Sequence, residues 1–344
     1  MSKKMKKILI LMIALCCNHA YALFEFVSNK TSEGVLDDHF FKELKNTFQP
    51  DIFFETGTYS GETTMAAIPY FKELVSVEFH EGLAEVAKRK FSEFTQVRVF
   101  YGQSPDLIRT IAPALKGTIL FWLDAHYSGE GTALSSNDLE SPDAITAIRN
   151  ELSAIQDTGI QDCVILIDDI RGFGTEVSGV DYMGCWAYPS IQEVEKAILK
   201  INLHFELALV GDILLAYDKT KYQPQFSEAV KACTKTRLYD GENLTDSELQ
   251  ELEKTIMHAS FQEKQCIKKL YSMMTGCKDP MFLHDLWYGL IELGDKNYTD
   301  AYRAFLKVKI RTQFLNKNGQ PDNKVLPYNH PRIDQYLQNC LSEL

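Results

Sequence analysis

The chain has 344 residues, of which 45% are hydrophobic and 24% charged, a composition that builds folded cores and excludes a disordered or collagen-like protein. Its 36 basic and 47 acidic residues give a formal net charge of −11, so we expect no broad basic face for nucleic acid or anionic lipid. The length suits one large domain or two modest ones.

The first 22 residues have the order of a secretory signal peptide. Four lysines precede an apolar run over residues 8–17, and the stretch closes on Ala20-Tyr21-Ala22. A run of about ten apolar residues is too short to cross a bilayer, which needs roughly 20. We therefore expect cleavage after Ala22, export to the periplasm or the outside, and no stable membrane span in the mature chain. An uncleaved anchor is the alternative.

Six cysteines remain after this cleavage: Cys163, Cys185, Cys233, Cys266, Cys277 and Cys340. An even number in an exported protein permits disulfides, and buried free thiols are the alternative. The chain has no Cys-x-x-Cys pair and no Cys/His cluster at zinc spacing, so we expect no structural zinc.

Residues 23–221 alternate apolar runs with helical patterns. A helix over 35–48 leads into the runs, and 189–200 has one apolar helical face. Most of the runs lack alternation, as strands covered on both faces do. They span 52–55, 74–79, 97–101, 118–123, 163–167, 205–210 and 213–217. Only Gly211-Asp212 separates the last two, a hairpin signal. The pattern predicts an α/β domain with a Rossmann-like, seven-stranded, mostly parallel sheet and an antiparallel last strand.

Residues 222–344 predict a small all-α domain. One long helical pattern covers 247–274, and further helices are expected over 281–293 and 299–315. The stretch 286–294, followed by Tyr298, Ala301 and Phe305, resembles one tetratricopeptide-type helix pair. A single unit cannot form a solenoid. A plain helical hairpin and a repeat-like module for a protein partner both remain open.

Candidate ligand-binding residues follow the first three strands. The first strand ends in Glu55-Thr56-Gly57-Thr58-Tyr59-Ser60-Gly61, whose glycines let the backbone approach a ligand at a helix N-terminus. Glu55 suits a cationic ligand better than a pyrophosphate. Glu78 ends the second strand about 20 residues later, a position suited to ribose hydroxyls. Gln103 and Ser104 follow the third strand and offer polar groups to an adenine ring.

Acidic residues follow the next two strands. Asp124 closes the fourth, and Asp168 and Asp169 close the fifth, so the three carboxylates should converge at one sheet edge. Hard oxygen ligands suit Mg²⁺ or Ca²⁺, and His126 offers a general base. The alternatives are that Asp124 binds only the cofactor, Asp168 caps a helix and His126 is a structural hydrogen-bonding group.

These motifs resemble the class I S-adenosylmethionine-dependent methyltransferases, and among them the catechol-type O-methyltransferases. The resemblance covers roughly residues 35–220 and rests on Glu-x-Gly-x-Tyr-x-Gly at 55–61, Val77-Glu78, Gly102-x-Ser104, Leu123-Asp124 and Asp168-Asp169. It implies contacts with the methionine end of the cofactor from Glu55, Gly57, Tyr59 and Gly61. It also implies that Glu78 binds the ribose and that Gln103 and Ser104 lie near the adenine.

In the catechol-type enzymes a divalent metal held by acids at these strand ends orients a substrate hydroxyl and lowers its pKa. The resemblance therefore implies an exported enzyme that O-methylates a small hydroxylated acceptor, with S-adenosylmethionine as cofactor and Mg²⁺ as a second candidate. One alternative is a non-catalytic secreted scaffold whose residues 222–344 bind a protein partner. Another is a different cofactor-binding α/β enzyme, such as a dehydrogenase.

Overall fold

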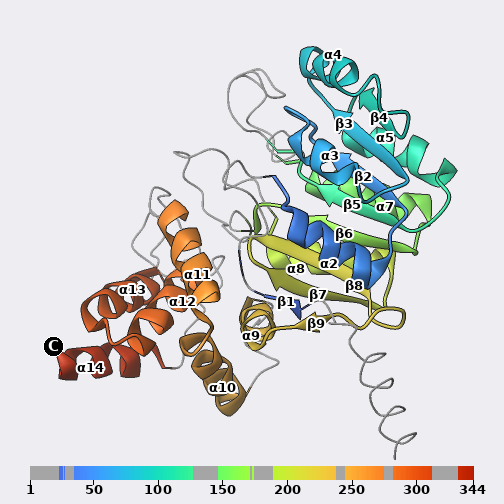
Figure 1. Ribbon diagram of the computed structural model, residues 1–344. Coiled ribbons are helices and arrows are strands. Elements are labelled where there is room, and N and C mark those ends of the chain that lie inside the picture. The colour runs from blue at the N-terminus through green and yellow to red at the C-terminus, as the bar shows by residue number, and fades with distance from the viewer. Residues whose placement is uncertain are drawn as a thin grey trace, which may run out of the picture.

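The computed structural model describes residues 23–25, 27, 35–126, 146–170, 173, 189–237, 245–274, 282–311 and 332–344. Its elements form an α/β unit followed by a group of helices, coloured brown to red in Figure 1. The predicted signal peptide, residues 1–22, lies outside the described residues.

The core of the α/β unit is a seven-stranded sheet. In spatial order its strands are β4 (Val97–Tyr101), β3 (Glu73–Glu78), β2 (Ile52–Thr56), β5 (Ile119–Leu123), β6 (Cys163–Ile167), β8 (Ile213–Asp218) and β7 (Phe205–Val210). Parallel pairing joins β4 through β6, and β8 runs antiparallel to both of its neighbours. The sheet confirms the predicted fold class, including the antiparallel last strand.

Helices cover both faces of this sheet (Figure 1). They are α2 (Asp38–Phe48), α3 (Glu62–Ala67), α4 (Glu81–Lys90), α5 (Ser104–Ile111) with the short 3₁₀ turn η1 (Ala112–Ala114), α7 (Ile148–Thr158) and α8 (Ile191–Ile201). On β2 the ring of Phe53 contacts Phe41 of α2, with ring centroids 5.8 Å apart. Because strand side chains alternate between faces, Glu55 shares the α2 face and Thr56 the opposite one.

A second, two-stranded sheet ties the start of the described chain to the end of the α/β unit. β1 (Leu23–Phe24) pairs in parallel with β9 (Gln225–Phe226). Phe24 is fully buried, and its ring contacts the rings of Phe40, Phe48 and Phe226. Phe24, the second residue after the predicted cleavage point, is therefore part of the core.

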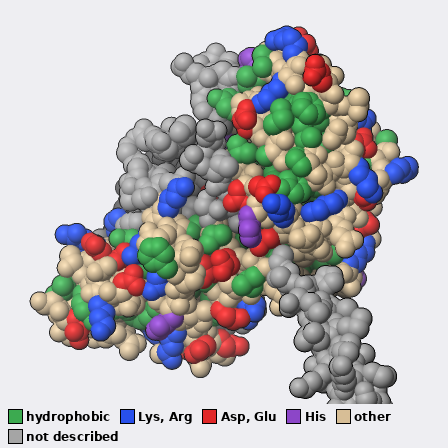
Figure 2. Space-filling view, in the orientation of Figure 1, with side chains coloured by type: hydrophobic (Ala, Val, Ile, Leu, Met, Phe, Trp, Pro, Cys, Tyr) green, Lys and Arg blue, Asp and Glu red, His purple; other side chains and the backbone are tan. Residues whose placement is uncertain are grey.

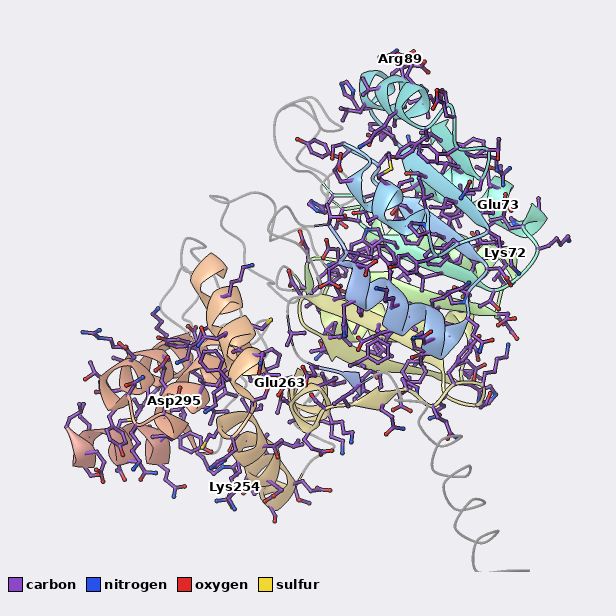
Figure 3. All side chains as sticks on the ribbon, viewed as in Figure 1. Lys72, Glu73, Arg89, Lys254, Glu263 and Asp295 are labelled. Atoms are coloured by element: carbon purple, nitrogen blue, oxygen red, sulfur yellow. The ribbon has the colours of Figure 1, made fainter. Side chains whose placement is uncertain are left out.

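Helix α9 (Glu228–Arg237) connects the α/β unit with the C-terminal helices. Thr234 Oγ1 accepts the backbone N–H of Leu209 on β7 at 2.8 Å. The indole N–H of Trp287 donates to Thr236 Oγ1 at 3.0 Å, and Ser227 donates to the carboxylate of Glu263, which is labelled in Figure 3. Hydrogen bonds thus cross the predicted domain boundary at residue 221.

The prediction of one helix over 247–274 is wrong, because the structure has α10 (Asp246–Met257) and α11 (Phe261–Met274) instead. Ser260 starts the second helix: its hydroxyl accepts the N–H of Glu263 at 3.3 Å, and the Glu263 carboxylate accepts the N–H of Ser260 at 3.1 Å. This reciprocal pair is a capping box, which fixes a helix start.

The remaining helices are α12 (Phe282–Gly294), α13 (Tyr298–Arg311) and α14 (Ile333–Glu343). The first two pack so closely that a Cβ on Gly289 would lie 2.6 Å from the Phe305 ring. Helices α12 and α13 thus pack against each other as a helical hairpin, and the tetratricopeptide-like interpretation finds no support among the described residues. Within the described ranges no helix is both long and apolar enough to cross a bilayer.

The described cysteines are free thiols. Cys163, Cys233, Cys266 and Cys340 are all buried, and burial raises the pKa of Cys163 and of Cys266 to about 12. Cys185 and Cys277 lie outside the described residues. The disulfide interpretation therefore has no support at the four described positions.

Charged side chains of both signs are interspersed over the face shown in Figure 2. Several form exposed ion pairs, such as Lys72 Nζ with Asp51 Oδ1 at 2.6 Å. Arg98 also pairs with Glu73 on the neighbouring strand (Glu73 and Lys72 are labelled in Figure 3). Exposed pairs of this kind contribute little to stability.

Candidate functional site

The carboxyl ends of five parallel strands are level with one another. Thr56 on β2 is in register with Val77 and Leu123, Glu78 with Tyr101, and Leu123 with Ile167. The residues that follow these strands therefore meet at one edge of the sheet, where ligands bind in open α/β folds.

The loop after β2 requires glycine at two positions. Gly57 and Gly61 have φ of 84° and 74°, in the left-handed region that L side chains rarely adopt. A Cβ on Gly57 would lie 2.6 Å from the carbonyl oxygen of Asp124, and one on Gly61 would lie 2.8 Å from the Phe91 ring. These two residues thus let the loop approach the end of β5 and let α3 start against α4.

Glu78 clamps that loop. Its Oε2 accepts the backbone N–H of Tyr59 at 2.7 Å, and its Oε1 accepts the N–H of His80 at 2.8 Å. The side chain of Tyr59 is 59% exposed and projects from the loop. Since a carboxylate has about four lone-pair sites, Glu78 retains acceptor capacity for a ligand hydroxyl.

Glu55 lies beneath the loop. It is 1% exposed, and its Oε2 accepts the hydroxyl of Ser76 at 2.5 Å and the hydroxyl of Thr64. Burial, helped by the charges of Asp124 and Glu78 and opposed by the Ser76 and Thr64 hydrogen bonds, raises the pKa of Glu55 to about 8. At pH 7 this carboxyl is therefore largely uncharged.

Gln103 and Ser104 form the turn into α5. Gln103 is the exposed N-cap of the helix, and its side chain makes no capping hydrogen bond. Ser104 is buried, and its hydroxyl donates to Glu151 Oε1 on α7 at 2.5 Å. Of the two predicted adenine contacts, the Gln103 side chain is the exposed one.

A cavity of about 210 Å³, which includes space open to solvent, opens at the ends of β5 and β6. It is lined by Leu123, Asp124, Ala125, His126, Thr146, Ile148, Glu151, Ile167, Asp168 and Phe173. The cavity brings together three predicted site residues, Asp124, His126 and Asp168. Glu55 does not line it.

His126 lies between two carboxylates. Its Nε2 is 3.2 Å from Asp124 Oδ1 and 3.3 Å from Asp169 Oδ2. Burial lowers the pKa of His126, but the hydrogen bond to Asp124 and the charges of Asp169, Asp124 and Asp168 outweigh that effect and raise it to about 10. The ring therefore carries a positive charge at neutral pH and balances part of the acidic cluster.

A cluster of three aspartates adjoins this pair. Asp168, Asp169 and Asp212 each offer a carboxylate oxygen, and these oxygens lie within 4.8 Å of one another. Asp169 has a φ of 56°, and its N–H donates to Asp168 Oδ1 at 2.6 Å. The grouping differs from the predicted ligand set, since Asp212 joins Asp168 and Asp169 while Asp124 pairs with His126.

Sequence reasoning missed two residues of this edge. Glu151 falls on the apolar stripe of α7 with Ile148, Leu152 and Ile155, and an acid at such a position is a signal of a buried polar contact. From the sequence alone, Asp212 is recognisable only as a hairpin residue. Nothing in the local sequence shows that the hairpin returns to the end of β6, where the Asp212 carbonyl accepts the N–H of Ile170 at 3.1 Å.

Comparison with known proteins gives likenesses to solved structures, among them O-methyltransferases. No family model and no curated protein matches the chain. The O-methyltransferase TomG from Streptomyces achromogenes, solved with SAM, is 17% identical with a TM-score of 0.35, over 52% of this chain and 78% of that one. Cofactor-bound Rv0187 from MTB is 18% identical with a TM-score of 0.33, over the same shares. The YcgJ protein from Bacillus subtilis is 14% identical with a TM-score of 0.33, over 66% and 85%.

At these TM-scores the likenesses say nothing about activity. The strand order of the sheet, with its one reversed strand, is by itself the Rossmann-like fold that the resemblance to class I methyltransferases implied.

Proposed function

We propose that this protein is an S-adenosylmethionine-dependent methyltransferase that O-methylates a small hydroxylated acceptor. One observation carries the proposal: a glycine loop, a carboxylate that clamps it and a small acidic cavity share one edge of a methyltransferase-like sheet. Gly57 brings the loop against the end of β5, and Glu78 fixes it from β3. An acidic edge suits a ligand with a positively charged sulfur.

The residues fit the cofactor by their chemistry. Glu78 would accept from ribose hydroxyls, the exposed amide of Gln103 would contact the adenine at the next strand end, and the 57–61 loop would face the methionine end. Tyr59, exposed on that loop, offers an aromatic ring. Glu55, buried beneath the loop, would lose its proton when the cationic cofactor binds, and its negative charge would then stabilise the bound cation.

Bound S-adenosylmethionine supplies a methyl group on a sulfonium sulfur. In the proposed reaction a bond would form between the acceptor oxygen and the methyl carbon, the sulfur–methyl bond would break, and the hydroxyl proton would pass to a base. Asp124, in the cavity wall, is one candidate base. His126 is the other; because it is protonated at neutral pH, it accepts a proton only once a cation offsets the carboxylates that raise its pKa.

A divalent cation is a further part of the proposal. Asp168, Asp169 and Asp212 form an all-carboxylate donor set of the kind that Mg²⁺ prefers. These residues would hold the ion, which when bound orients a hydroxyl and lowers its pKa. Titrating Mg²⁺ into the protein and into Asp212→Asn tests this part, since equal heats from both would remove the cluster from the proposal.

Calorimetry of the folded protein with S-adenosylmethionine tests the main proposal. We expect binding by the wild type and a loss of about 1–3 kcal/mol in Glu78→Ala, which removes the clamp and the acceptor for a hydroxyl. Glu73→Ala is the matched control, because Glu73 begins the same strand and pairs with exposed Arg98. No binding by the wild type at millimolar cofactor, with or without Mg²⁺, would refute the proposal.

The alternative, a non-catalytic secreted scaffold whose C-terminal helices bind a protein, has one observation in its favour. Both oxygens of Glu78 accept backbone N–H groups, and Glu78 and Glu55 are both buried. In this case Glu78→Ala would leave the biological phenotype intact, whereas deletion of the C-terminal helices would abolish it.

Export also remains a proposal. It is supported by the lysine-flanked apolar run before Ala22 and by the burial of Phe24 two residues later. N-terminal sequencing of the native protein should give Leu23. Retention of residues 1–22 would favour the anchored form.

A further inference from the structure

One carboxyl group of the cavity has no part in the proposed chemistry. Glu151 lies in the first turn of α7 and is only 1% exposed, yet it lines the cavity together with Asp124 and Asp168. A buried carboxyl is costly unless its oxygens are hydrogen-bonded. Its partners therefore indicate what it holds in place.

Those partners come from separate strand ends. Ser104, the first residue of α5, donates its hydroxyl to Glu151 Oε1 at 2.5 Å. The hydroxyl of Thr56, at the end of β2, acts on the same carboxyl and lowers its pKa. Thr56 in turn accepts the N–H of Asp124 through both its carbonyl oxygen and its Oγ1, each at 3.2 Å.

We propose that Glu151 is a positioning residue that fixes the turn into α5 relative to the ends of β2 and β5. If the proposed function holds, Glu151 connects two parts of the cofactor site. One is the nucleoside side at Gln103 and Ser104, and the other is the methyl-transfer side at Asp124; this part of the inference rests on the proposed function. The hydrogen bonds themselves do not depend on that function.

A neutral side chain can make these bonds. Burial and the charge of Asp124, opposed by the Ser104 and Thr56 hydrogen bonds, raise the pKa of Glu151 to about 7. The carboxyl is thus protonated in a large share of molecules at neutral pH, and a protonated carboxyl both donates and accepts, as a glutamine amide does. Glu151→Gln should therefore keep the arrangement that Glu151→Ala loses.

The same two helices offer a matched control. Near the C-terminal end of α7, Asp157 Oδ2 accepts from Arg109 Nε of α5 at 2.9 Å, in an exposed ion pair. Asp157→Ala removes a contact between α5 and α7 without touching the strand ends. A role specific to the site predicts different results for Glu151 and Asp157.

Hydrogen exchange by mass spectrometry and calorimetry with S-adenosylmethionine, applied to the full-length variants, test the proposal. In Glu151→Ala we expect faster exchange in peptides covering 56–58, 102–107 and 123–125, and a cofactor dissociation constant raised about tenfold, the loss of roughly one buried hydrogen-bonding group. Glu151→Gln should match the wild type in both readouts within about twofold. Asp157→Ala should leave these peptides unchanged.

Unchanged exchange at the three peptides in Glu151→Ala would overturn the proposal, and so would a Glu151→Gln protein as impaired as Glu151→Ala. If Glu151→Ala fails to fold, Ser104→Ala replaces it, and we expect faster exchange confined to 102–107; no change there would equally overturn the proposal. A wild type that does not bind the cofactor refutes the proposed function, while the exchange results still decide the role of Glu151.

Discussion

Replacement of Glu55 by glutamine should change how the stability of the α/β unit depends on pH. The carboxyl is buried, and its pKa is raised from an ordinary 4.5 to about 8 in the folded protein. Between these values the folded state holds a proton that the unfolded state has lost. Stability from this group is thus fully present below pH 4.5 and is lost as the pH rises through 8.

The size of the effect follows from the shift. One pH unit corresponds to 1.36 kcal/mol, so the interval from 4.5 to about 8 amounts to about 5 kcal/mol at most. Glutamine cannot ionise, and its carbonyl oxygen can still accept from Ser76 and Thr64. The free energy of unfolding of Glu55→Gln should therefore equal that of the wild type near pH 5. Between pH 5 and pH 8 the difference in favour of the variant should grow by up to about 1.4 kcal/mol per pH unit.

Urea unfolding followed by far-ultraviolet circular dichroism at pH 5, 6, 7 and 8 measures this difference. Glu62→Gln is the control, because Glu62 lies nearby on α3 but is half exposed and paired with Lys90. We expect no comparable gain with pH in that variant. Parallel stability curves for the wild type and Glu55→Gln would refute the assignment of a buried, proton-carrying carboxyl.

Three further predictions test the packing by unfolding experiments. Gly57→Ala should lower the free energy of unfolding more than Gly159→Ala does. Both residues have positive φ, so each substitution should cost about 1–2 kcal/mol, but only alanine at position 57 adds a clash. Equal losses would contradict the close approach of Gly57 to the end of β5. Glu253→Ala should lower the unfolding free energy of the helical group by about 3–5 kcal/mol, because Glu253 is fully buried and Arg332 would lose the carboxylate that accepts two of its N–H bonds. A loss under about 1 kcal/mol would mean that the pair is hydrated. Phe24→Ala should cost about 3–5 kcal/mol and half-exposed Leu23→Ala much less; similar small losses would show that β1 is not part of the core.

The sheet could be predicted from the sequence because most of its strands are continuous apolar runs. Each predicted strand boundary lies within one residue of the observed one, and the hairpin at Gly211-Asp212 indicated the reversed strand. The two-residue strands β1 and β9 carry no such signal, because pairing over two residues leaves no periodicity. The break between α10 and α11 was missed although Ser260 and Glu263 have the spacing of a capping box, since the apolar pattern continues across it.

The site was less predictable than the fold. Residues directly after strands, such as Glu78 and Asp124, could be placed because the strand ends are level in a parallel sheet. The direction of each side chain could not, and it separates Glu55, which turns under the loop, from Asp124, which lines the cavity. Glu151 and Asp212 come from a helix and a hairpin whose positions depend on long-range packing.

The pairing of β1 with β9 has a consequence for the order in which the chain assembles. Leu23 and Gln225 are partners across about 200 residues, so this contact closes a loop that contains the whole seven-stranded sheet. A chain that emerges N-terminus first cannot form it until residue 226 has also emerged. The contact of Phe24 with Phe226, although Phe24 lies near the start of the chain, therefore forms only after the last strand of the sheet has emerged.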